Sequence, residues 1–254
     1  EMWATRFGLI LAMAGNAIGL GNFLRFPTQA AQNGGGAFMI PYFVALLLLA
    51  MPLMWIEWAM GRFGGSKGHG TTPGIFGLLW KNKSAKYIGV LGIFLPLAVL
   101  IYYVFIESWT LAYAFFSVTK EYFGIMDRGA MTTFFGDFIG KGGNYRTVYI
   151  FFLITLFLNV LIMYRGIAKG VEMLAKVAMP LLFIFAIILV VRVFTLGAPD
   201  PSNPGQSILN GLGFIWNPDF SLLRESRIWL AATGQVFFTL SIGFGAIQCY
   251  ASYI

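Results

Sequence analysis

The chain has 254 residues, of which 58% are hydrophobic and 11% are charged, and its formal net charge is +7. A soluble domain carries roughly 25% charged residues, so this composition excludes a water-soluble globular enzyme. Disorder is excluded as well, because it requires few hydrophobic residues and many charges. The positive charges lie in short clusters between apolar runs, which argues against nucleic-acid binding and predicts a lipid bilayer as a partner.

Six apolar stretches are long enough to cross a bilayer, which takes about 20 residues per helix. They cover residues 7–26, 37–60, 87–116, 147–164, 177–196 and 228–254. Backbone hydrogen bonds in lipid must be satisfied within a segment, and these stretches do not alternate apolar and polar residues as barrel strands do. We therefore predict an all-α membrane protein with a single transmembrane domain of six helices over residues 1–254.

The charges between the stretches predict how the chain is oriented. Linker 61–86 carries five basic residues and no acid, and linker 165–176 carries three basic residues and one acid. The alternate linkers, 117–146 and 197–227, together hold six acids. Because basic linkers stay in the cytoplasm, we predict a multi-pass protein of the cell's inner (plasma) membrane with a cytoplasmic N-terminus.

Two stretches contain residues that break helices. Residues 15–22 hold three glycines and two asparagines, and residues 234–245 hold three glycines beside Thr239 and Ser241. Each glycine lowers helix stability by about 1 kcal/mol relative to alanine, and asparagine is costly in hydrocarbon unless it is hydrogen-bonded. Close packing of Gly15 and Gly19 against another helix explains the glycines but not the asparagines. We predict helices that unwind in mid-membrane, where free carbonyls coordinate a cation and free amides bind an anion.

Catalytic residues are scarce. The single histidine, His69, lies in a glycine-rich basic loop, and the single cysteine, Cys249, excludes an internal disulfide. The predicted spans contain no pair of aspartates. We therefore predict that the chain is not an enzyme.

Several motifs carry a family resemblance. They are WATR at 3–6, GNAIGLGNFLRFP at 15–27, NGGGAF at 33–38, PLMWIE at 52–57, IYY at 101–103 and FFTLS at 237–241. In these motifs the chain resembles the neurotransmitter:sodium symporters, from Trp3 to Ile254. The family has twelve spans, so the resemblance covers its first half. It implies a LeuT-like inverted-repeat fold with discontinuous first and sixth helices, of which the first repeat and one further span are present. A missing second half of the transporter is then a partner, and a homodimer stays open.

The resemblance also implies the site residues. Two sodium sites are expected, with ligands from Gly15, Ala17, Ile18, Asn22 and Thr239. The amino-acid substrate is expected to contact Ala17, Leu20, Gly21, Val99, Tyr103, Phe238, Thr239, Ser241 and Phe244. Gate residues are expected at Trp3, Arg25, Tyr103, Phe238, Ser252 and Tyr253. Glu57, inside the second stretch, is expected to be a buried structural acid near the broken sixth helix.

The implied function is sodium-coupled symport of a small apolar zwitterionic amino acid, leucine-like, by alternating access. Glycine stands at position 19, where monoamine-carrying relatives have an aspartate, so the substrate is expected to supply its own carboxylate. The alternative is a non-transporting membrane subunit or scaffold that packs against a partner. Sodium-dependent ligand binding separates the two.

Overall fold

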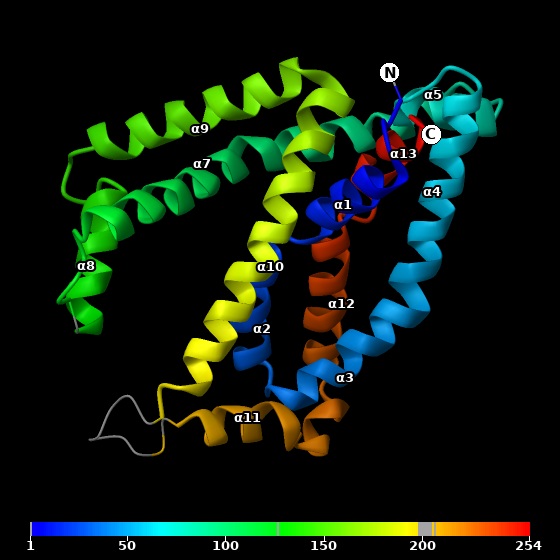
Figure 1. The fold of residues 1–254 in the computed structure, drawn as a ribbon. Coiled ribbons are helices and arrows are strands. Elements are labelled where there is room, and N and C mark those ends of the chain that lie inside the picture. Colours follow the sequence, from blue (N-terminus) through cyan, green and yellow to red (C-terminus); the bar gives the residue numbers. More distant parts are fainter. Residues whose placement is uncertain (1, 126, 198–204, 206) are drawn as a thin grey trace. The chain divides into compact units, whose positions relative to one another are not determined.

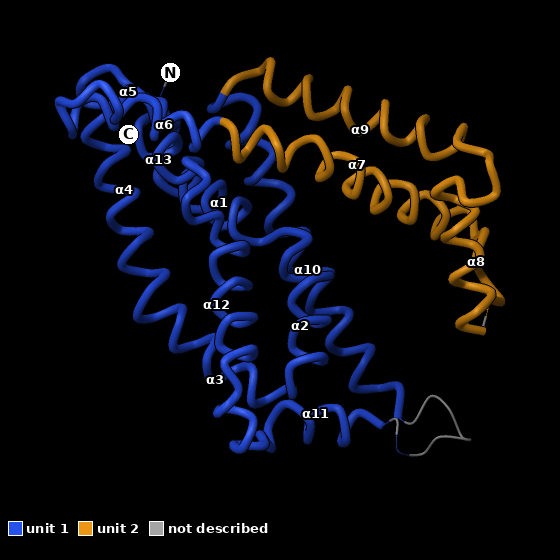
Figure 2. Tube along the Cα trace, turned by 180° about the vertical axis from the view of Figure 1, so that it is seen from behind, with its two compact units in different colours: residues 1–93, 167–254 blue, residues 94–166 orange. Residues whose placement is uncertain are grey.

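The structure is a computed structural model that describes residues 2–125, 127–197, 205 and 207–254. Its chain divides into two compact units, one of residues 1–93 and 167–254 and one of residues 94–166 (Figure 2). Every regular element of the described residues is a helix. This agrees with the predicted all-α class.

Helices of the first unit are labelled along the chain in Figure 1. Before the second unit they are α1 (Arg6–Ala17), the π-helix η1 (Gly21–Arg25), α2 (Phe26–Gln32), α3 (Gly36–Ala45), the π-helix η2 (Leu46–Ala50), α4 (Met51–Ser66), α5 (Thr72–Leu79) and α6 (Ser84–Gly89). After it they are the π-helix η3 (Ile167–Glu172), α10 (Met173–Phe194), α11 (Ile208–Trp216), the 3₁₀ helix η4 (Phe220–Arg224), α12 (Ser226–Leu240) and α13 (Ala246–Ala251).

The core of the first unit forms where α12 packs against α3 and η1. Buried small residues, Ala232 of α12 and Ala30 of α2, bring these helices close around the fully buried ring of Phe38. Further along, α13 packs on α4. The backbone of Gln248 and Ser252 lies so close to Gly61 and Gly65 that a side chain at either glycine would overlap it. The predicted stretch 228–254 therefore packs against η1, α3 and α4.

The second unit consists of most of α7 (Leu91–Thr119), α8 (Arg128–Phe138) and α9 (Arg146–Tyr164). Aromatic rings from all three helices pack edge to face around the buried side chains of Phe116 and Phe138. Glu107 of α7 accepts a hydrogen bond from Asn159 Nδ2 of α9 at 2.9 Å. This pairing satisfies two polar side chains that would be costly in lipid.

Four helical segments among the described residues are long and apolar enough to span a membrane: Gly36–Ser66, Ser84–Thr119, Arg146–Tyr164 and Ile167–Phe194. A fifth span forms if Arg6–Ala17 and Gly21–Gln32 count as one, although they are bent by 43°. The predicted count of six spans stays a prediction. Linker 165–176 is helical from Ile167 onward, and its acid, Glu172, pairs with Lys176.

Candidate functional site

The helices α1 and η1 are separated by residues 18–20, and that they form one discontinuous membrane helix stays a prediction. α1 begins after Thr5, whose hydroxyl accepts a hydrogen bond from Gly8 N at 2.9 Å, and it ends at Ala17 because Ile18 has extended backbone angles (φ −104°, ψ 100°). The helix resumes at Gly21. Asn22 Nδ2 donates to the Ala17 carbonyl across this break at 3.2 Å. Two predicted sodium ligands, Ala17 and Asn22, are thus in direct contact.

Gly15 and Ile18, the ligands predicted for the second sodium, lie on either side of Ala17 at the end of α1. A Cβ atom at Gly15 would lie 3.5 Å from Met179 Sδ, so α10 covers this part of α1. Ile18 N still donates to the Ala14 carbonyl at 2.7 Å, which makes Ile18 the last residue bonded to α1.

The second interruption follows α12. Ser241 has left-handed backbone angles (φ 54°), and Gly243 and Gly245 have φ of 84° and 75°. Positive φ values cannot continue a right-handed helix, so α12 ends at Leu240 and α13 begins only at Ala246. Gly243 N donates to Glu57 Oε1 of α4 at 2.6 Å. In a continuous helix that amide would donate to the carbonyl of Thr239, four residues earlier.

Glu57 is therefore built into the broken segment. Its side chain is buried, with 8% of the residue exposed, and its second oxygen, Oε2, is buried without a hydrogen-bond partner among the described residues. Because Glu57 takes the Gly243 amide, the Thr239 carbonyl loses its usual helical donor. The expected place of Glu57 near the broken sixth helix agrees with this contact.

Gln235 joins the two interruptions. Its fully buried side chain donates from Nε2 to the Gly21 carbonyl at 2.9 Å and to Thr239 Oγ1 at 3.1 Å. Its Oε1 accepts a hydrogen bond from Arg25 Nη1. The predicted sodium ligand Thr239 is thereby tied to the restart of the first helix. Sequence reasoning missed Gln235, since a lone glutamine beside Gly234 carries no motif of its own.

The predicted gate residues Arg25 and Phe238 also meet. The Arg25 guanidinium lies 4.9 Å from the centre of the Phe238 ring, within the range of a cation–π interaction. Phe238 packs on Gly21, where a Cβ atom would lie 3.0 Å from the ring. Glycine at position 21 therefore lets the ring and the backbone approach closely.

The remaining predicted substrate residues divide between the two units. Leu20, Phe238, Ser241 and Phe244 lie at the two interruptions of the first unit. Val99 and Tyr103 lie one helical turn apart on α7, in the second unit. Their meeting with the interruptions stays a prediction.

At the other end of α1, Trp3 contacts the last turn of α13 and the residues that follow it. Its indole Nε1 donates to the Tyr250 carbonyl at 2.9 Å, its ring packs edge-on against that of Tyr250, and its backbone N donates to the Tyr253 carbonyl at 3.3 Å. Ser252 Oγ donates to the Cys249 carbonyl at 2.6 Å. The structure thus brings Trp3, Tyr250 and Tyr253 together, and their role as a gate stays a prediction.

Glu172 is a second contact point for the start of α1 that sequence reasoning did not single out. Its carboxylate is fully buried and accepts from Ala4 N at 2.8 Å and Thr5 Oγ1 at 2.7 Å, while Lys176 Nζ lies 2.7 Å away. Gly8 leaves room for it, because a Cβ there would overlap the carboxylate. Only the i, i+4 spacing of Glu172 and Lys176 was visible in the sequence.

The chemistry of the interruptions suits a monovalent cation. The described residues contain no group of three or more His, Cys, Asp or Glu side chains that could hold a metal ion. The residues predicted to bind sodium carry neutral oxygens instead: the Ala17 carbonyl and the Asn22 amide at the first interruption, and the Thr239 hydroxyl near the end of α12. Hard cations prefer oxygen ligands, and a neutral set matches a single positive charge better than a double one.

Helices that are long and apolar enough to span a membrane define an all-helical membrane protein. The chain matches the model of the sodium:neurotransmitter symporter family over residues 1–123 and 136–254. It belongs to that family of sodium-dependent symporters, which confirms the resemblance seen in its motifs.

Individual relatives agree with this assignment. The chain is 33% identical over 270 residues to an uncharacterised sodium-dependent transporter of Methanocaldococcus jannaschii, covering 100% of the chain and 49% of the relative. It is 28% identical over 306 residues to a sodium-dependent dopamine transporter of Caenorhabditis elegans, covering 100% and 47%. The crystal structure of MhsT in complex with L-phenylalanine superposes with a TM-score of 0.84 at 34% identity, covering 100% and 54%. The chain spans about half the length of the relatives it matches.

Proposed function

We propose that this chain forms the first half of a symporter that couples sodium entry to the uptake of an apolar zwitterionic amino acid. The observation that supports it best is the connection between the two helix interruptions. Gln235 bonds both the restart of the first helix, at Gly21, and the Thr239 hydroxyl of the sixth. A cation held by Ala17, Asn22 and Thr239 therefore bridges two helices that alternating access would move.

Sodium is a co-transported substrate in this proposal, and it replaces existing hydrogen bonds. Asn22 presents its NH₂ group to the Ala17 carbonyl. A cation between them requires the amide to turn, so that Asn22 Oδ1 and the Ala17 carbonyl both face the ion. In a continuous helix the Gly243 amide would compete with sodium for the Thr239 carbonyl, but here that amide donates to Glu57. A second sodium near Gly15 and Ile18 is proposed on the family resemblance.

The charge of the interruptions favours a substrate that carries its own carboxylate. Residues 15–22 and 237–243 contain no acid. An amine without a carboxylate would meet no counter-charge there, and it would leave the amides of Leu20 and Gly21 without an anion. A zwitterionic amino acid supplies that anion next to the sodium, and its ammonium group is placed at the carbonyls of Phe238, Thr239 and Ser241.

An apolar substrate side chain fits the pocket that the sequence predicts from Phe238, Phe244 and Val99. The relative crystallised with L-phenylalanine, MhsT, supports this class of substrate. Tyr103, on α7, is proposed to donate its hydroxyl to the substrate carboxylate.

The proposed alternating access uses two sets of contacts, one between η1 and α12 and one between the residues before α1 and the end of α13. On one side Arg25 holds Gln235 and Phe238, and on the other Trp3 holds Tyr250 and Tyr253. Opening one set while the other stays closed would expose the sodium site to one side at a time. Positive-inside charge places the Trp3 contacts on the cytoplasmic side.

The test is equilibrium binding to the complete transporter across a sodium titration. We expect radiolabelled L-leucine or L-phenylalanine to bind only with sodium and to be displaced by other apolar amino acids. Potassium at equal concentration serves as the control. Binding that ignores sodium would point to a non-transporting scaffold, and dopamine that outcompetes leucine would refute the zwitterion argument.

A further inference from the structure

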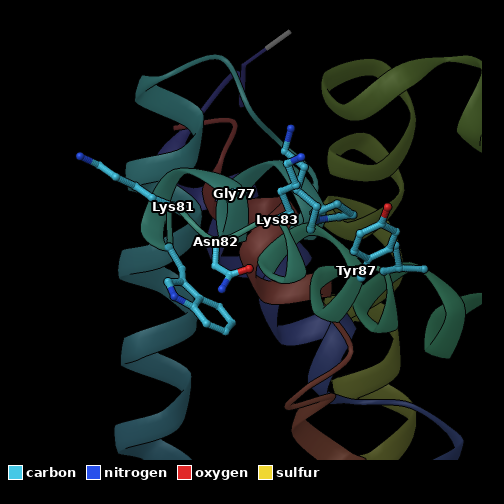
Figure 3. A pocket seen from close by; sticks show the side chains of 9 residues that line it. Gly77, Lys81, Asn82, Lys83 and Tyr87 are labelled. Atoms are coloured by element: carbon cyan, nitrogen blue, oxygen red, sulfur yellow. The ribbon is translucent and has the colours of Figure 1, made fainter.

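A basic pocket lies in the linker between the second and third spans, and none of its lining residues belongs to the helix interruptions. The pocket has a volume of about 660 Å³ and is lined by residues of α5, of α6 and of the turn between them (Figure 3). We refer to it as the α5–α6 pocket. Its lining includes Gly77 of α5, Lys86 and Tyr87 of α6, and Lys81 and Lys83 of the turn.

The pocket is shaped by close helix packing. At Gly89 the backbone of α6 approaches that of Pro73, because a Cβ there would lie 2.6 Å from Pro73 Cα. The aliphatic stem of Lys86 lies across Gly77, with its Cε 3.0 Å from a Cβ built at that position. In the turn, Asn82 Oδ1 accepts a hydrogen bond from Ser84 N at 3.0 Å, which fixes the backbone that carries Lys81 and Lys83.

The electrostatic character of the pocket is positive. Lys81, Lys83 and Lys86 all line it, and residues 61–86 contain no acid. The ion pairs between described residues are formed by Lys176 with Glu172 and by Arg227 with Glu225, so none involves these three lysines. Three cations that share one pocket without a protein counter-ion attract an anion.

The rim of the pocket is apolar and exposed. Trp80, Tyr87 and Val90, all in the lining, are 49%, 76% and 47% exposed. Leu79 and Ile88 beside them are exposed as well. Tryptophan and tyrosine are enriched at membrane interfaces, and the helical segment Ser84–Thr119, which begins with α6 at this pocket, is apolar enough to span the bilayer. The anion that fits this site therefore carries an apolar body.

We propose that the α5–α6 pocket binds the phosphate headgroup of an anionic phospholipid. Lys83 and the hydroxyl end of Tyr87 point to the same side, whereas Lys81 extends away from them (Figure 3). Lys83 and Lys86 hold the phosphate, Lys81 provides longer-range attraction, and Trp80 and Tyr87 lie at the boundary between headgroup and acyl chains. Long lysine side chains keep their charged ends in the polar layer while their stems lie on apolar surface.

The test compares lipids and variants in the complete transporter. Native mass spectrometry of protein released from nanodiscs counts bound phosphatidylglycerol and phosphatidylcholine. The double variant Lys83→Gln, Lys86→Gln removes two pocket charges, and Arg62→Gln, Lys67→Gln removes two charges of the same linker outside the pocket. Each pocket lysine is expected to contribute about fivefold in affinity for phosphatidylglycerol, so the pocket variant should bind about 25-fold more weakly. The control variant should change little, and Lys83→Arg, Lys86→Arg should retain binding.

Three results would overturn the proposal. The first is a pocket variant that binds phosphatidylglycerol as well as the control variant does, at an unchanged melting temperature. The second is equal binding of phosphatidylcholine. The third is displacement of the lipid by inorganic phosphate when sodium chloride of the same ionic strength has no effect, which would assign the pocket to a soluble phosphate.

Discussion

Replacing Glu57 by alanine tests how the sixth helix is kept open. The Glu57 carboxylate accepts the Gly243 amide at 2.6 Å in a buried setting. Hydrogen bonds to charged groups contribute about 2 kcal/mol, so its loss is expected to shift the balance from the interrupted to the continuous helix by about thirtyfold. Gly243 would then return its amide to the Thr239 carbonyl, and sodium would lose that ligand.

The assay is L-leucine binding at a series of sodium concentrations, beside thermal unfolding of the same variants. Glu57→Ala is expected to weaken sodium-dependent binding by about thirtyfold and to remain folded, since a carboxylate at membrane depth itself costs about 2.5–3.5 kcal/mol. Glu57→Gln keeps an oxygen acceptor and should lose only about fivefold. Unchanged binding in Glu57→Ala would refute the role of the Gly243 contact, and equal losses in both variants would assign the effect to charge.

Two further predictions concern the ion ligands and the start of α1. Asn22→Ala and Thr239→Ala are each expected to weaken sodium binding and substrate binding together, by about tenfold, because linkage between bound ligands is reciprocal. Isothermal titration measures both affinities, and a loss of substrate affinity alone would contradict the prediction. Gly8→Ala places a methyl group against the buried Glu172 carboxylate and should lower stability by about 1–3 kcal/mol, whereas Gly211→Ala in α11, with no atom within 4 Å, should not lower it; thermal unfolding compares the two.

The first helix interruption was predictable because its cause is local. Gly15, Gly19 and Gly21 weaken the helix within about two turns, and Asn22 supplies the side chain that bonds the freed Ala17 carbonyl. Composition and spacing alone contain this information. The apolar stretches were predictable for the same reason, since a hydrophobic run long enough for a bilayer is read directly from the sequence.

The contacts that hold the interruptions were harder to predict because each joins distant residues. Gln235 and Gly21 are 214 positions apart, and Glu172 and Ala4 are 168 apart. A single glutamine in an apolar helix is as compatible with packing as with function until its partner is known. Linker 165–176 was interpreted from its charges alone, and only the structure shows that Glu172 is buried and that the segment is helical from Ile167 onward.

The polar groups that the proposal gives to sodium share a property that bears on coupling. The Ala17 carbonyl holds Asn22 Nδ2, and the Thr239 hydroxyl holds Gln235 Nε2. Sodium binding is therefore an exchange of hydrogen bonds for ion contacts, and its net free energy is smaller than the sum of the new contacts. Because Gln235 also bonds Arg25 and Gly21, releasing Thr239 changes the contacts of these two residues. An ion that must displace these hydrogen bonds binds most tightly to the conformation in which they are already broken. Ion-coupled transport requires such a difference in affinity between two conformations.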